Sequence, residues 1–175
     1  MSYLCTSLKQ EQIMNFDVIV IGSGPGGYVA AIRAAQLGHK VAVVEKSELG
    51  GVCLNWGCIP TKALLKSAQV FDYINHASDY GITVDSAKHD FGAVIKRSRG
   101  VAEGMSKGIQ FLMKKNKIEI LRGFGKLIAK GQVSVDNEGK KETHSAKHII
   151  LATGARERQL PNLPIDGKKI VGYHE

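Results

Sequence analysis

The chain has 175 residues and a mass of 18.9 kDa, of which 43% of residues are hydrophobic and 23% are charged. This length suits one domain with one sizeable core, and the hydrophobic fraction excludes a globally disordered protein. The formal net charge of +8 favours the binding of acidic partners, nucleic acid included, so this class of function stays open. No apolar run approaches the roughly 18 residues that a membrane crossing needs, so we expect no membrane span.

The N-terminal residues 1–13 match neither a secretory signal nor a transit peptide, because they hold one Lys, no Arg and no sustained apolar stretch. We therefore expect a cytoplasmic location. Three cysteines, an odd number without an export signal, argue against a structural disulfide framework. Any disulfide here is expected to be functional.

Residues 16–45 predict one βαβ unit. The apolar run 16–21 is followed by a glycine-rich turn, a helix-favouring stretch and a second apolar run at 40–45. Pro25 suits an early helical position, and Gly38 is placed to end the helix. Because a crossover helix makes its two strands parallel and adjacent, the unit indicates an α/β class.

The rest of the chain predicts two more helices and a group of short strands. A helix is expected over 60–80, and apolar residues recur at helical spacing from Phe91 for about six turns, which is typical of a long amphipathic helix. Four short strands are expected to form a β-meander, and a last apolar run should return to the central parallel sheet. The expected strands lie at 118–121, 125–129, 132–135, 142–145 and 148–152.

The glycine-rich turn has the spacing of a dinucleotide site. Gly22, Gly24 and Gly27 follow a strand and open a helix, and Glu45 comes 45 − 27 = 18 residues later. Gly22 allows the tight turn, Gly24 lets a pyrophosphate approach the backbone, and Gly27 lets helix and strand pack closely. Glu45 would accept hydrogen bonds from ribose hydroxyls and repel a 2′-phosphate, which disfavours NADP. The turn predicts a Rossmann-like domain, but it leaves open whether NAD or FAD binds.

Cys53 and Cys58 follow Glu45 directly, where the second strand meets the ligand crevice of such a fold. On a regular helix, residues five apart have Cα atoms about 8 to 9 Å apart, beyond the roughly 7 Å limit for a disulfide. The segment must therefore be irregular if the thiols pair, and its glycines and Pro60 supply irregularity. A helix start beside Lys62 would favour a reactive thiolate.

Two blander interpretations of these cysteines remain open. They could be reduced core residues, or they could bind zinc together with His144 and His148. The zinc alternative is weaker, because 85 residues separate Cys58 from His144, far from the spacing of a zinc finger. We therefore expect no metal site.

The positive charge is concentrated in residues 96–130, which hold ten basic residues against two acidic ones. A solvated helix face is the commoner explanation of such a stripe. The alternative is a non-catalytic module in which the basic helix from Phe91 to Lys117 docks an acidic partner. Nucleic-acid binding is the less favoured version of that alternative.

From about Met14 onward the chain resembles the FAD domain of dihydrolipoyl dehydrogenases, which are class I pyridine nucleotide-disulfide oxidoreductases. Because the resemblance places a usual family start at Met14, residues 1–13, with Cys5, would be an N-terminal extension. The C-x-x-x-x-C block is shared with mercuric and glutathione reductases, so another flavin disulfide reductase of that kind is the alternative. The segments that carry the resemblance are Gly22 to Gly27, Glu45-Lys46, Gly50 to Lys62 and Ala152-Thr153-Gly154-Ala155.

The resemblance implies a fold, a cofactor and a set of roles. The fold is a Rossmann-like FAD/NAD(P)-binding domain, with a central parallel sheet, helices on one face and a β-meander on the other. Cys53 and Cys58 would form a redox disulfide, with Cys53 exchanging with dihydrolipoamide and the Cys58 thiolate donating charge to the flavin. The expected FAD-binding residues are Gly22, Gly24, Gly27, Glu45, Lys46, Gly51, Val52, Lys62, Gly125, Ala152, Thr153 and Gly154.

The same resemblance implies an activity and partners for the full-length enzyme. It would reoxidise protein-bound dihydrolipoamide with NAD as a substrate, act on a lipoyl domain of a 2-oxoacid dehydrogenase complex or the glycine cleavage system, and form a homodimer. No second G-x-G-x-x-G follows residue 27. We therefore expect 14–160 to be the FAD-binding domain and 161–175 a linker toward a missing NAD-binding domain, and we expect the 175-residue chain alone to lack turnover.

Overall fold

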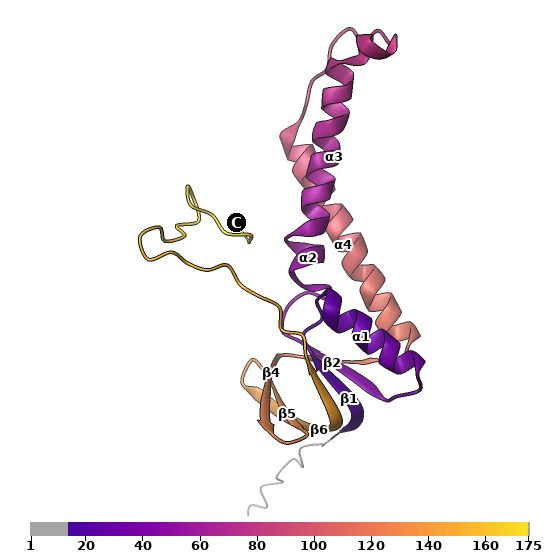
Figure 1. Cartoon of the computed structure of the whole chain (residues 1–175), viewed down its shortest axis with the longest axis vertical. Helices are drawn as coiled ribbons and strands as arrows, with labels where there is room; N and C mark the ends of the chain where they lie inside the picture. Colours follow the sequence, from indigo (N-terminus) through magenta and orange to yellow (C-terminus); the bar gives the residue numbers. More distant parts are fainter. Residues whose placement is uncertain (1–13, 175) are drawn as a thin grey trace, which may run out of the picture.

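The computed structural model describes residues 14–174, so the expected extension at 1–13, with Cys5, lies outside the described residues. The described chain is built on one six-stranded sheet with the strand order β3-β2-β1-β6-β5-β4 (Figure 1). Its elements are β1 (Asn15–Ile21), α1 (Pro25–Gln36), β2 (Val41–Glu45), α2 (Gly51–Asn55), α3 (Cys58–Asn75), the 3-10 helix η1 (Ala77–Tyr80), α4 (Phe91–Lys115), β3 (Glu119–Arg122), β4 (Phe124–Ala129), β5 (Gln132–Asn137) and β6 (Lys140–Leu151).

One half of the sheet is parallel. β1 pairs in parallel with β2 on one side and with β6 on the other, and β2 pairs in parallel with β3. The crossover helix α1 begins at Pro25, and the chain leaves it through Gly38, which has a φ of +89°. The predicted βαβ unit and the α/β class are confirmed.

The other half of the sheet is antiparallel and shares β6 with the first. β6 pairs with β5 from Lys140 to Ser145 and with β1 from Ser145 to Leu151. The strands expected at 142–145 and 148–152 are therefore one continuous strand. The strand expected at 118–121 is β3, and it extends the parallel edge beside β2 instead of belonging to the meander. Short apolar runs look alike in sequence, so only the pairing partners in the sheet distinguish a parallel strand from a strand of the meander.

The sheet has a hydrophobic core on each face. The first core lies under the helices, with buried residues from β1, α1, β2, α4 and the loop before α2. The second lies where β4, β5 and the start of β6 turn over the other face, and Gly125 of β4 comes so close that an added Cβ would be 3.0 Å from side-chain atoms of Ile21 and Val44. The largest fully buried apolar side chains are Ile19, Met113, Val20, Val41, Val43, Val44 and Val133.

Helices α3 and α4 form a long hairpin that projects away from the sheet (Figure 1). Arg97 of α4 donates hydrogen bonds to the Ala63 carbonyl and to Ser67 Oγ, at 2.8 and 3.4 Å, and so ties the two helices together. α4 confirms the predicted amphipathic helix, because its buried residues recur at helical spacing. Within residues 14–174, no helix is both long and apolar enough to cross a membrane.

His144 is the unusual residue of the second core. Its side chain is fully buried beside Phe16, and neither ring nitrogen has a hydrogen-bond partner among the described residues. The facing charge is Glu142, whose Oε2 lies 3.7 Å from His144 Nε2 and favours the charged ring. Burial outweighs that attraction and lowers the pKa of His144 below its ordinary value of 6.5.

The stability of the fold should therefore fall as the pH drops below 6.5. In this range His144 takes up a proton in the unfolded chain but stays neutral in the folded chain. The free energy of unfolding can therefore fall by up to about 1.4 kcal/mol per pH unit. Chemical denaturation between pH 7.5 and 5 measures it. His144→Leu should flatten this part of the profile, whereas His148→Gln, at an exposed position on the same strand, should not. Equal slopes for the protein and for His144→Leu would contradict the assignment.

Candidate functional site

A large cleft opens at the carboxyl ends of the parallel strands β1, β2 and β6, and its volume is about 1080 Å³. This edge of a parallel sheet is where α/β folds bind their ligands. The cleft brings together the glycine-rich turn, the end of β2, the cysteine segment, the start of β4 and the chain after β6. Segments far apart in the sequence therefore share one cavity.

The glycine-rich turn is wedged between the ends of two strands. The Gly22 N–H donates to the Val44 carbonyl of β2 at 2.8 Å, and the Ala152 N–H donates to the Ile21 carbonyl of β1 at 2.8 Å. Gly22 has a φ of +100°, and a Cβ there would lie 2.2 Å from the Ala152 carbonyl oxygen. Only glycine fits this position, for reasons of both conformation and space.

Gly27 supports the turn from behind and does not line the cleft. A Cβ on Gly27 would lie 1.9 Å from the Gly22 carbonyl oxygen, so the first turn of α1 packs directly on the loop backbone. Gly24 differs from both, since a Cβ there would meet no atom within 4 Å. Gly24 lines the cleft, and its open surroundings leave room for a ligand to approach the backbone.

Glu45 lies at the end of β2, and its carboxylate is held by hydrogen bonds from two serines. Ser23 N and Ser23 Oγ both donate to Glu45 Oε2, at 2.9 and 2.6 Å, and Ser47 N donates to Oε1 at 2.9 Å. Ser23 is fully buried. Sequence reasoning missed Ser23, although its place inside the glycine motif was a usable signal. These hydrogen bonds fix the Glu45 carboxylate at the wall of the cleft. A carboxylate has about four acceptor sites, so it can still accept hydrogen bonds from a ligand.

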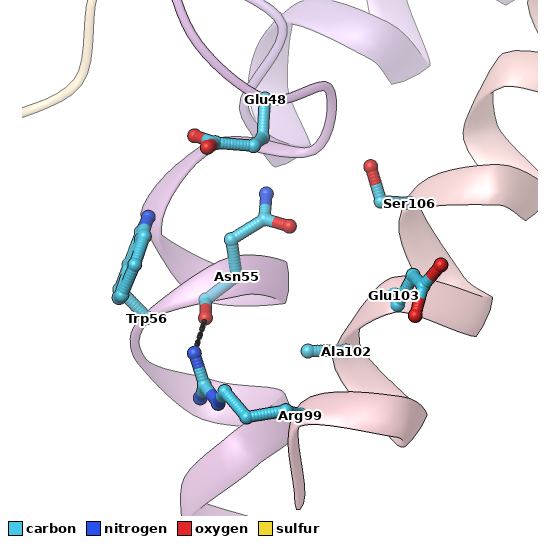
Figure 2. A pocket seen from close by; sticks show the side chains of 7 residues that line it. All are labelled: Glu48, Asn55, Trp56, Arg99, Ala102, Glu103 and Ser106. Atoms are coloured by element: carbon cyan, nitrogen blue, oxygen red, sulfur yellow. Dashed lines mark hydrogen bonds between the residues drawn. The ribbon is translucent and has the colours of Figure 1, made fainter.

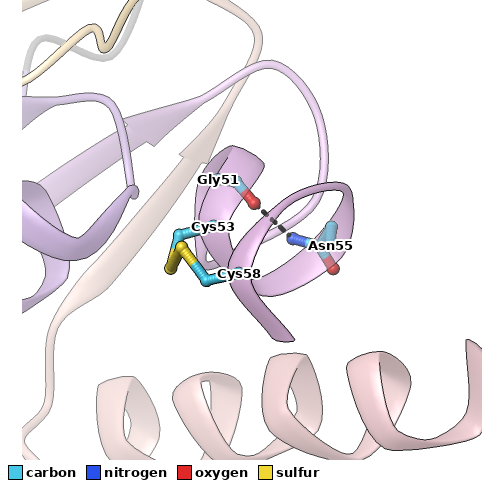
Figure 3. Close-up of a disulfide and its surroundings, with 4 residues drawn as sticks. All are labelled: Gly51, Cys53, Asn55 and Cys58. Carbon is cyan, nitrogen blue, oxygen red and sulfur yellow. Dashed lines mark hydrogen bonds between the residues drawn. A yellow bond between two sulfur atoms is a disulfide. The ribbon is translucent and has the colours of Figure 1, made fainter. Parts of the chain in front are cut away.

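The two cysteines form a disulfide across a break between helices. α2 ends at Asn55 and α3 begins at Cys58, with Trp56 and Gly57 between them. The break brings the Cα atoms of Cys53 and Cys58 to 4.6 Å (Figure 3), well inside the distance that a continuous helix would give. The predicted irregularity is thus a two-residue joint. Cys58 lies at the positive end of the α3 dipole, which favours a thiolate there after reduction.

The cleft brings together most of the residues expected at a cofactor site, although their roles stay predictions. Lys62 is the exception besides Gly27, because it is exposed on α3 and does not line the cleft. The expected residues that line it are Gly22, Gly24, Glu45, Lys46, Gly51, Val52, Gly125, Ala152, Thr153 and Gly154, together with Cys53 and Cys58. The lining residues that sequence reasoning did not select as site residues include Ser23, Ser47, Trp56, Arg156, Glu157, Tyr173 and His174.

The zinc alternative gains no support from the structure. Cys53 and Cys58 are joined to each other, and His144 lies in the second core beside Phe16. Over residues 14–174, no three side chains of His, Cys, Asp or Glu gather closely enough to hold a metal ion.

Replacing Gly27 by Ala should destabilise the fold, because the clashing Gly22 oxygen belongs to a backbone held on both sides. We expect a loss of about 3 kcal/mol in the free energy of unfolding, measured by urea denaturation. Gly26→Ala is the matched control, since it lies in the same turn of α1 and a Cβ there meets nothing within 4 Å. Its stability should be unchanged or slightly higher. Equal stability of the two variants would refute the packing role.

The comparisons with known proteins agree with this site. The family described as pyridine nucleotide-disulphide oxidoreductase matches residues 16–175. The dihydrolipoyl dehydrogenase of Rhizobium etli is 52% identical over 92% of this chain and 37% of its own length, and that of Zymomonas mobilis is 53% identical over 91% and 34%. The chain thus spans about a third of the length of these curated relatives.

A solved structure is similar in fold as well. The Cu(II) complex of the HOCl-induced flavoprotein disulfide reductase RclA from Escherichia coli has a TM-score of 0.72 and 25% identity, over 85% of this chain and 31% of that one. The resemblance to dihydrolipoyl dehydrogenases and the Rossmann-like fold class expected from the motifs are confirmed. Since the family match runs from residue 16 to residue 175, the chain belongs to the pyridine nucleotide-disulphide oxidoreductase family.

Proposed function

We propose that this chain is the FAD-binding, redox-disulfide part of a dihydrolipoyl dehydrogenase. The observation that carries the proposal is that the Cys53–Cys58 disulfide lines the same cleft as the glycine-rich turn and Glu45. A dinucleotide site and a redox-capable disulfide in one cavity are what an enzyme needs to pass electrons between a dithiol and a flavin. The dihydrolipoyl dehydrogenase relatives favour this function over that of a mercuric or glutathione reductase.

The residues of the cleft fit an FAD molecule. The volume of about 1080 Å³ lies just above the usual range of ligand sites, which is roughly 300 to 1,000 Å³, and so leaves room for a ligand as large as a dinucleotide. The pyrophosphate would lie on the N–H groups at the start of α1, beside the open Cα of Gly24, and the adenosine ribose against Glu45. Phe124 and Gly125 line the cleft beyond Glu45, which suits the adenine. When bound, FAD would accept the electron pair of the reduced cysteines and pass it to NAD in the complete enzyme.

The cysteines would carry out the exchange with the substrate. A thiolate of dihydrolipoamide attacks Cys53 Sγ and forms a mixed disulfide, while the bond to Cys58 breaks and Cys58 leaves as a thiolate. The second substrate thiol gives its proton to water or buffer and displaces Cys53, which closes the lipoamide disulfide. Cys53 leaves as a thiolate and takes up a proton from solvent, so both cysteines end reduced. The substrate is oxidised by two electrons and the cysteine pair takes them up. The position of Cys58 at the start of α3 stabilises the thiolate that leaves.

The finer assignments belong to the same proposal. We take residues 14–160 as the FAD-binding domain and 161–175 as the linker toward an NAD-binding domain. The complete enzyme would serve a lipoyl domain of a 2-oxoacid dehydrogenase complex or the glycine cleavage system, as a homodimer in the cytoplasm. The dihydrolipoyl dehydrogenase relatives support this role.

A docking role for the basic helix is less well supported. Arg97 and Arg99 of α4 donate hydrogen bonds to the carbonyls of Ala63 and Asn55, and Lys107 pairs with Glu103 at 2.6 Å. Part of the positive charge of 96–130 therefore serves the fold, which leaves less of it free for an acidic partner.

Loading the purified chain with FAD and recording spectra tests the proposed function. The FAD complex should be yellow, and Cys53→Ser should show a long-wavelength charge-transfer band without any reductant, because Cys58 is then free as a thiolate. Cys58→Ser should lack the band, and the unsubstituted protein should gain it only after two-electron reduction. NADP should not compete with FAD, since Glu45 repels a 2′-phosphate.

Two results would overturn the proposal. A folded protein that cannot be loaded with FAD would remove the cofactor assignment. Identical spectra for Cys53→Ser and Cys58→Ser would remove the separate roles of the two thiols.

A further inference from the structure

The joint between the two cysteines is contacted by an arginine from a distant helix. Arg99 of α4 lies 44 residues from Asn55 in sequence, and its Nη1 donates to the Asn55 carbonyl oxygen at 2.9 Å (Figure 2). The guanidinium carbon of Arg99 lies 5.4 Å from the centre of the Trp56 ring. One cation therefore contacts two of the four residues that separate Cys53 from Cys58.

The Asn55 carbonyl is a group that needs such a donor. Asn55 is the last residue of α2, and the final carbonyls of a helix have no partner within it. Arg99 supplies a charged donor, and such hydrogen bonds are roughly twice as strong as neutral ones. Its planar face also suits an aromatic ring, in a way that a lysine ammonium does not match.

The side chain of Asn55 is fixed as well. Its side-chain nitrogen donates to the carbonyls of Leu49 and Gly51, each at 3.0 Å, and only 8% of the residue is exposed. Ser106 of α4 donates to the same Leu49 carbonyl at 2.9 Å. The short helix α2 is thus held at its start by its own Asn55 and by Ser106, and at its end by Arg99.

Arg99 reaches the joint from outside the large cleft. It lines a separate cavity of about 210 Å³ between α2 and α4, which Figure 2 shows, and it does not line the large cleft. Trp56 lines both cavities, and so forms part of the wall between them. Any effect of Arg99 on the disulfide would therefore pass through Asn55 and Trp56, and needs no contact with a dinucleotide in the cleft.

We propose that Arg99 is a positioning residue that holds the Asn55–Trp56 joint so that Cys53 and Cys58 stay close enough to pair, and thereby sets the stability of the disulfide. This inference rests on the proposed redox role of the two cysteines. A held joint raises the effective concentration of one thiol at the other, because less conformational freedom is lost when the bond forms. Loss of Arg99 should therefore make the disulfide easier to reduce.

Equilibration with glutathione measures this stability. Two glutathione molecules give up two electrons and two protons and become glutathione disulfide, while the Cys53–Cys58 bond breaks and the cysteine pair takes up the two electrons. Cys53 takes up one proton, and the other goes to Cys58 or to the buffer. Arg99→Ala should lower the equilibrium constant for disulfide formation about tenfold, which corresponds to about 30 mV for a two-electron couple. The exchange is stopped by alkylating the free thiols. The mass of the protein then gives the ratio of the dithiol to the disulfide form of the Cys53–Cys58 pair.

Arg97→Ala is the matched control. Arg97 has the same charge, comes from the same helix and also donates to a backbone carbonyl, but its partners are Ala63 and Ser67 of α3. Its removal should leave the glutathione equilibrium within about twofold of the unsubstituted protein. Arg99→Lys, which keeps the charge but loses the planar fork, should recover only part of the effect.

Trp56 provides a second, independent measurement. It is the one tryptophan of the sequence, so tryptophan emission reports on the joint directly. Arg99→Ala uncovers the ring, and the emission maximum should move to longer wavelength, whereas Arg97→Ala should leave it in place. Urea denaturation of each variant shows whether a shift comes from the joint or from unfolding.

The outcomes separate this inference from the proposed function. If Arg99→Ala is folded and its glutathione equilibrium matches that of Arg97→Ala, the positioning role is wrong, although the redox disulfide stands. The same holds if both variants shift equally, because the effect would then be one of charge or general stability. If Cys53 and Cys58 form no reversible disulfide in the unsubstituted protein, the proposed function itself fails.

Discussion

The close contact between the glycine-rich turn and the ends of β2 and β6 is the constraint on which the rest of this structure depends. Gly22 sits against the Ala152 carbonyl on one side and under Gly27 on the other, with no room for a Cβ at either glycine. This contact sets the distance of α1 from the sheet and brings the start of α1, at Pro25, to the wall of the cleft. It also fixes where the chain leaves β6, so that Thr153 and Gly154 line the same cavity.

The position of the segment that carries Cys53 and Cys58 depends on the glycine-rich turn and on contacts from α4. The loop after β2 returns to the turn through the Gly50 N–H, which donates to the Ser23 carbonyl at 3.1 Å, and this contact starts α2 beside the cleft. From there the position of the cysteines depends on α4, whose Ser106 and Arg99 reach the two ends of α2. A helix of five residues has little stability of its own, so tertiary contacts must hold it.

The sheet joins two kinds of pairing through one strand. β6 is antiparallel to β5 along its first half and parallel to β1 along its second, which lets β4 and β5 close over the second core without a separate domain. The same closure buries His144 with no hydrogen-bond partner among the described residues. A histidine in such a place ties the stability of the second core to pH, at a point well removed in sequence from the cysteines.

Local spacing was enough to predict the βαβ unit, the turn and the acid at Glu45, because each is defined by residues within about 45 positions and by steric rules of the backbone. The pairing of Cys53 with Cys58 was implied by the resemblance to dihydrolipoyl dehydrogenases. The need for a break between Cys53 and Cys58 followed from helix geometry alone. Only the tertiary structure decided that β3 pairs beside β2 and that β6 is one continuous strand. The same holds for the hydrogen bonds from Ser23 to Glu45 and from Arg99 to Asn55. These features depend on which distant segments become neighbours, and neither hydrophobic period nor motif spacing carries that information.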